Sequence, residues 1–193
     1  MTIYGWAKYL TAVILMAASI NASAIDCYQE SPGFARDSET YFDIDEPGPV
    51  TSRQQSHISN LFSSFVGKRL KGKGTSFECV GPERSAKKLF KNYTITAEIQ
   101  QHADGQLVIG VEFFDEKKKI THRETLRYFG RNNPFHILES SDNKLIVSAK
   151  LRIQKVLDEQ IAEISVRNNT LMISQTRYRN GYFANQLTMS LDL

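Results

Sequence analysis

The stretch "ISQTRYRNGYFANQLTM", residues 173–189, has a turn signal at Asn180-Gly181 between two runs in which apolar and polar residues alternate. Alternation with a period of two predicts β-strands, and Asn-Gly is a strong signal for a hairpin turn. The register of this hairpin decides whether Arg177 faces a core or the solvent, because a slip of one residue moves every side chain to the other face.

The two possible registers of this hairpin differ in the side chains that they pair. A two-residue loop would place Ile173 opposite Thr188 and mix apolar with polar residues. A three-residue loop over 179–181 places Ile173 opposite Leu187 and keeps one face apolar, and this loop type is common. We therefore expect the three-residue loop, with Arg177 on the inward face.

Three further turns, each chosen for its own chemistry, extend the same apolar face. A three-residue loop at 103–105 pairs Ile99 with Ile109, a loop at 141–143 with Asn143 left-handed pairs Ile137 with Val147, and a two-residue loop at 168–169 pairs Ile164 with Ile173. Agreement among independently chosen turns is the main argument for the topology.

The remaining pattern predicts one short helix followed by strands. Ile58, Leu61, Phe62 and Phe65 recur at helical spacing, Thr51 or Ser52 can cap the helix, and Gly67 can end it. Strands are expected at 69–79, 92–101, 105–114, 119–129, 135–140, 143–153, 159–167, 170–178 and 182–192, with a helical turn at 83–90. The fold class is all-β: an antiparallel up-and-down barrel or a strongly curved meander of about nine strands.

Residues 58–193 resemble the calycin class of β-barrels, which includes the lipocalins. The resemblance rests on a short helix that leads through "FVGKRLKGKG" (65–74) into a glycine-rich first strand, followed by up-and-down hairpins. Leu70 stands where lipocalins usually carry a tryptophan. The resemblance implies a small apolar ligand inside the barrel.

The N-terminus has the features of an export signal, which predicts a periplasmic or secreted protein. Lys8 precedes an apolar run, and Ala22-Ser23-Ala24 forms a cleavage site, so residues 1–24 are interpreted as a signal peptide. No membrane-spanning segment is expected in the mature chain. Residues 25–51 are polar and rich in proline, which predicts an irregular N-terminal arm, and residues 52–193 are expected to form the barrel domain with its lead-in helix.

Cys27 and Cys79 are the two cysteines of the chain. In an oxidising compartment they are expected to form a disulfide, which would tie the arm to the first strand and stabilise the fold by roughly 4 kcal/mol. Neither lies in a CxxC pattern, so the sequence indicates no metal site and no redox cofactor.

The formal charge is close to balanced, with 24 basic and 21 acidic side chains, which argues against nucleic acid as a partner. Arg123, Arg127 and Arg131 alternate along the predicted outer face of one strand and could dock an acidic partner or a membrane surface. Asn92 and Asn168 begin glycosylation acceptor patterns, which matter only in a host that glycosylates.

Several polar residues are expected on the inward face. A turn at Glu116-Lys117 would pair Val111 with His122 and turn His122, Glu124 and Tyr128 inward, and the last hairpin adds Gln175, Arg177 and Asn185. These six side chains could anchor the polar group of a ligand, with Arg177 as the charge partner and Tyr128 near the mouth. The alternatives are an internal Glu124–Arg177 salt bridge, or a mouth open to water into which Arg177 extends.

Two functions remain open at this stage. The first is an exported lipocalin-like protein that holds a small amphipathic or apolar ligand in a cavity of several hundred cubic ångströms. The second is an envelope protein–protein interaction module, an assembly factor or an inhibitor, with a packed and ligand-free barrel. No enzyme is expected, because no nucleophile is placed beside a base and an orienting group.

Overall fold

The computed structural model describes residues 27–80, 87–130 and 134–193. Two helices precede nine strands in the order α1 (Pro32–Arg36), α2 (Ser52–Phe62), β1 (Arg69–Val80), β2 (Lys87–Gln101), β3 (Leu107–Phe114), β4 (Ile120–Tyr128), β5 (His136–Ser141), β6 (Lys144–Ile153), β7 (Val156–Arg167), β8 (Thr170–Arg179) and β9 (Tyr182–Asp192). The all-β prediction with one longer helix before the strands is confirmed. The signal peptide predicted at residues 1–24 lies outside the described residues.

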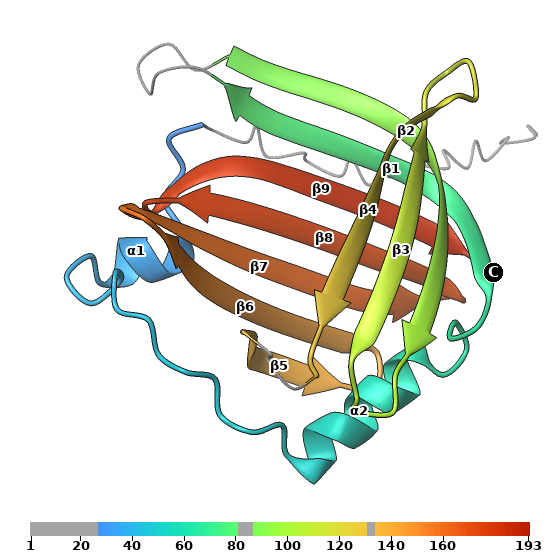
Figure 1. The fold of residues 1–193 in the computed structure, drawn as a ribbon, viewed down its shortest axis with the longest axis horizontal. Coiled ribbons are helices and arrows are strands. Elements are labelled where there is room, and N and C mark those ends of the chain that lie inside the picture. The colour runs from blue at the N-terminus through green and yellow to red at the C-terminus, as the bar shows by residue number, and fades with distance from the viewer. Residues whose placement is uncertain (1–26, 81–86, 131–133) are drawn as a thin grey trace, which may run out of the picture.

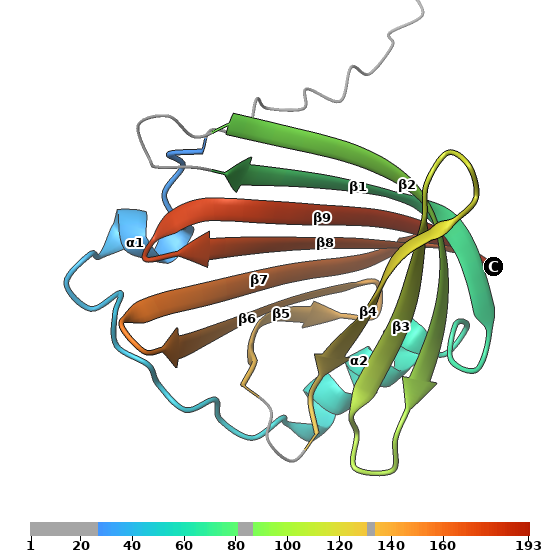
Figure 2. The same cartoon turned by 45° about the horizontal axis from the view of Figure 1, so that its top comes forward.

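The nine strands form one antiparallel sheet in the order β4-β3-β2-β1-β9-β8-β7-β6-β5. The sheet curls so strongly that β2, β3 and β4 face the strands of the other half across the interior (Figure 1). It is a half-barrel with its two edges at β4 and β5. Helix α2 lies between β5 and the β2–β3 turn at one end of the interior, and the ends of β6 to β9 mark the opposite end (Figure 2).

Two of the predicted turns have the expected geometry. Ile99 pairs with Ile109 across the loop at 103–105, and Ile164 pairs with Ile173 across the loop at 168–169. Asn168 and Asn169 both have positive φ, 50° and 63°, as a type I′ turn requires.

The last hairpin has a different register from the one predicted. Arg179 pairs with Tyr182, so the turn has two residues, and a bulge at Ala184 restores the face pattern, which gives the pairs Arg177–Asn185 and Ile173–Met189. The predicted pairing of Ile173 with Leu187 is therefore wrong by two residues. A shift of two keeps each side chain on its face, so Arg177 still faces inward.

Two other hairpins also differ from their predicted turns. In the β5–β6 hairpin Ile137 pairs with Val147 as expected, but a bulge at Leu138 shortens the turn to two residues, and Asn143 does not have positive φ. In the β3–β4 hairpin the left-handed residue is Lys118, with φ 59°, and Val111 pairs with Glu124 instead of His122. Bulges are hard to read from sequence because they depend on the strain of the curled sheet.

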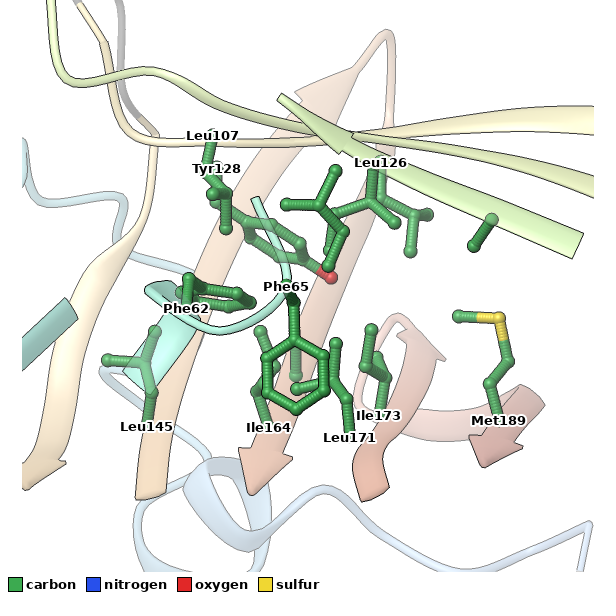
Figure 3. Packing of buried hydrophobic residues seen from close by; sticks show 14 of the residues in the cluster. Phe62, Phe65, Leu107, Leu126, Tyr128, Leu145, Ile164, Leu171, Ile173 and Met189 are labelled. Carbon is green, nitrogen blue, oxygen red and sulfur yellow. The ribbon is translucent and has the colours of Figure 1, made fainter. Parts of the chain in front are cut away.

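The core fills the concave side of the sheet next to α2. Thr51 caps α2 and forms a capping box with Gln54, and the helix ends at Phe62, earlier than predicted. Phe62 and Phe65 insert between the two halves of the sheet (Figure 3). The other side chains drawn around them are those of Leu107, Leu126, Tyr128, Leu145, Ile164, Leu171, Ile173 and Met189.

The N-terminal arm is more ordered than the sequence predicted. It contains α1 and packs on the convex face of β7 to β9, where Tyr41 is buried and its hydroxyl donates a 2.8 Å hydrogen bond to Glu159. The disulfide between Cys27 and Cys79 confirms the predicted link from the arm to β1. The arm is polar in composition, and its aromatic cluster was not predicted from the sequence. This cluster includes Phe34 and Tyr41, whose ring centroids lie 5.1 Å apart.

The helical turn predicted at 83–90 is wrong for residues 87–90, which belong to β2. Residues 83–86 lie outside the described part of the chain. The small and charged residues of "ERSAKK" (83–88) occur in helices as well as in strands, so their propensities do not distinguish a helical turn from a strand.

Gly72 lies opposite Leu191 where β1 pairs with β9. A Cβ atom on Gly72 would lie 1.8 Å from the carbonyl oxygen of Ser190, whereas a Cβ on Gly110 would meet nothing within 4 Å. We expect Gly72→Ala to lower the free energy of unfolding by more than about 3 kcal/mol, because the clash is with backbone. Gly110→Ala is the control and should change it by less than about 1 kcal/mol. Urea denaturation followed by circular dichroism measures both, and equal effects would contradict the role of Gly72.

Candidate functional site

The concave face changes from apolar to polar over three adjacent cross-strand rows. A row here is a set of residues that lie opposite one another on neighbouring strands. The row nearest α2 is mostly apolar and contains Leu145, Ile164, Ile173, Met189, Gly74 and Tyr93. The next row contains Val147, Ala162, Gln175, Leu187, Ser76 and Lys91, and the third contains Ala149, Gln160, Arg177, Asn185, Glu78 and Leu89. Polar side chains therefore replace the core toward the end that is far from α2.

The polar rows form the floor of a groove with a volume of about 490 Å³. Strands β1 and β2 border it on one side and β6 and β7 on the other, while His122 and Glu124 reach it from β4. Leu151 and Ile153 of β6 add an apolar rim and are 50% and 59% exposed.

Five of the six predicted site residues line this groove: Arg177, Gln175, Asn185, His122 and Glu124. Tyr128 does not lie near the mouth as expected. It is 1% exposed within the core, and its hydroxyl donates to the side-chain oxygen of Gln175 at 3.5 Å. Burial raises the pKa of Tyr128, so the phenol stays neutral and positions Gln175 from below.

Arg177 pairs with Asp158, not with Glu124. Its Nη2 lies 2.6 Å from Oδ2 of Asp158, whose other oxygen is 3.4 Å from Nε of Arg179. The Asp158 side chain is 11% exposed, whereas that of Arg177 is 40% exposed. Asp158 thus orients Arg177 and leaves part of the guanidinium open to the groove. The predicted Glu124–Arg177 alternative is wrong.

Glu124 is half-buried, and within the described residues it makes neither a hydrogen bond nor an ion pair. Burial raises the pKa of its carboxyl group, and the nearby His122 opposes this shift. The His122 ring stacks on Phe113 with the centroids 4.0 Å apart, and Tyr93 meets both rings edge-on. Glu124 is therefore an acceptor next to these aromatic rings for which the described residues supply no donor.

Sequence reasoning missed Asp158, Gln160, Glu78 and Tyr93 as lining residues. Asp158 and Gln160 could have been found, because extending the 168–169 hairpin places Gln160 opposite Arg177. Glu78 and Tyr93 could not, because the pairing of β1 with β9 closes over more than a hundred residues and no local turn sets it.

The groove offers hydrogen-bond donors, acceptors, charges of both signs and an apolar rim. Such a surface can bind the polar group of a small molecule and shield its apolar part. In the described part of the chain, no three His, Cys, Asp or Glu residues lie close enough to hold a metal ion. None of the described helices has the length and apolar character to cross a membrane.

Comparison with known proteins returns a distant structural match. The crystal structure of Rv2717c from M. tuberculosis superposes with a TM-score of 0.42 and 12% sequence identity, covering 75% of this chain and 98% of that one. No family model and no curated protein matches the chain.

Glu124→Gln tests the electrostatics of the groove. A raised pKa in the folded state means that Glu124 favours folding while it is protonated and that this contribution is lost as the pH rises through the raised pKa. Glutamine cannot ionise, so the variant should melt at a higher temperature than the parent chain at neutral pH. The difference should shrink as the pH falls and vanish below about pH 3, where the carboxyl group is protonated in both states. A variant that melts lower at neutral pH would mean that the carboxylate has a donor in the fold.

Proposed function

We propose that the protein is an exported, lipocalin-like binding protein that holds a small amphipathic molecule in the groove at the open end of the half-barrel. The observation that supports this most directly is that Gln160, Gln175, Arg177 and Asn185 replace core residues on a concave face that is apolar next to α2. These four side chains are only partly buried, so their polar groups are accessible from the groove. Accessible polar groups that converge in a concave site favour a binding role.

The packing of the core narrows the class of ligand. Phe62 and Phe65 occupy the interior next to α2, so a long hydrocarbon chain has no path along the barrel axis. We therefore place the ligand in the groove, with its polar group near Arg177 and Gln160 and its apolar part against Leu151 and Ile153. A volume of about 490 Å³ lies in the range of small-molecule sites, about 300–1,000 Å³.

Binding without chemistry fits the side chains better than catalysis does. His122 lies 3.0 Å from the hydroxyl of Thr121 and stacks on Phe113, contacts that hold the imidazole in place. Asp158 is engaged by two arginines and does not orient a base. We propose no enzymatic activity and no cofactor for this groove.

The interaction-module alternative has less support on the outer face. Arg123 is ion-paired with Glu112, with 2.8 Å between Nε and Oε1. Arg131 lies outside the described residues. The arginine stripe therefore reduces to Arg127 and a paired Arg123, which is a weak basis for a docking site.

The first experiment is native mass spectrometry of the protein purified from its own host, followed by organic extraction of whatever co-purifies. The proposal expects a small-molecule adduct that extraction removes. A chain that carries no adduct and also fails to bind the fluorescent amphiphile anilinonaphthalene sulfonate would overturn it.

A size-matched pair of variants locates the binding to the groove. Gln160→Trp fills the groove from its floor, while Ile161→Trp places the same side chain on the opposite face of β7. We expect Gln160→Trp to weaken binding of anilinonaphthalene sulfonate at least about tenfold, equivalent to about 1.4 kcal/mol, and Ile161→Trp to weaken it by less than about twofold. Equal losses in the two variants would place the dye elsewhere.

A further inference from the structure

Two strand segments at the open end of the half-barrel combine exposed apolar residues with lysines. "KLFK" (88–91) at the start of β2 exposes Leu89 and Phe90, which are 41% and 62% accessible. "LRIQK" (151–155) at the β6–β7 turn exposes Leu151 and Ile153. Both segments contribute residues to the lining of the groove, so they stand on opposite sides of its mouth.

Arg152 donates a hydrogen bond to the carbonyl oxygen of Phe42, whereas the lysines of these two segments have unpaired charges in the described part of the chain. Lys88, Lys91 and Lys155 are exposed, and within the described residues none of them forms an ion pair. The acidic residues nearby are Asp158, which two arginines neutralise, and Glu78 and Glu124, which line the groove. The rim of the mouth therefore has a positive charge surplus.

We propose that this rim, Leu89, Phe90, Leu151 and Ile153 with Lys88, Lys91 and Lys155, docks on the surface of a bilayer that contains anionic lipid. Exposed leucine, isoleucine and phenylalanine side chains can enter the boundary of the acyl region while lysines stay at the level of the headgroups. Each basic residue near an anionic surface strengthens binding, and the exposed apolar side chains add to it.

A bilayer fits the rim better than a folded protein partner does. The four apolar side chains come from two separate segments with a polar groove between them, so they do not form the continuous apolar patch typical of a protein interface. A lipid surface needs no such continuity, because each side chain can insert on its own. Docking there would also point the groove toward the bilayer, because residues of both segments line it.

Sedimentation with lipid vesicles tests the proposal on the protein as its own host produces it. We expect binding to vesicles that contain phosphatidylglycerol and at least about tenfold weaker binding to vesicles of phosphatidylcholine alone, because each lysine at an anionic surface contributes about fivefold. No binding to phosphatidylglycerol vesicles, or equal binding to both lipids, would overturn the proposal.

Two pairs of variants separate the rim from the rest of the surface. Lys88→Glu with Lys155→Glu should lower phosphatidylglycerol binding at least about tenfold, and Lys68→Glu with Lys117→Glu, at exposed positions away from the mouth, should lower it less. Phe90→Ser with Ile153→Ser should lower binding, while Leu138→Ser with Ile120→Ser serves as its control. Equal losses in rim and control variants would overturn the assignment to the rim.

Discussion

The extra residue in β9, Ala184, is the constraint on which both faces of the sheet depend. Beyond it, Asn185 and Arg177 pair on the concave face. Before it, Phe183 and Tyr178 pair on the convex face, with their rings 6.2 Å apart. Without the bulge a two-residue turn would place one of these pairs on the wrong side. One inserted residue therefore supplies polar groups to the groove and aromatic groups to the surface beneath the arm.

The aromatic side chains on the convex face account for the position of the N-terminal arm. The convex aromatic surface near the β8–β9 turn would face water if residues 27–45 did not cover it. Tyr41 packs there, with Lys150 bonded to its carbonyl oxygen at 2.7 Å and stacked 4.5 Å from its ring. The Cys27–Cys79 disulfide fixes the start of the same segment to β1. The arm thus acts as a second packing layer for the part of the sheet whose concave side is polar.

The sequence correctly predicted which side chains face inward. The inward face of Arg177, His122 and Glu124 followed from period-two alternation, which survives register errors of two residues. The predicted turn types were wrong where a bulge lies next to the turn, as at Leu138 and Ala184, because bulges depend on sheet curvature that no local pattern encodes. The buried Asp158 partner of Arg177 was within reach, since the turn at 168–169 was read correctly and places it opposite Arg179.

The two ends of the half-barrel have opposite roles, and each makes the other possible. Next to α2 the interior is filled with apolar side chains, including Phe62 and Phe65, and burial at about 25 cal/mol per Å² supplies most of the stability there. At the other end, Glu78, Glu124 and Arg177 contribute little apolar burial and leave space between the strands. A fully packed barrel would have no room for a ligand, and a fully open one would lack a core. The change of polarity along three rows of side chains is what allows one sheet to serve both purposes.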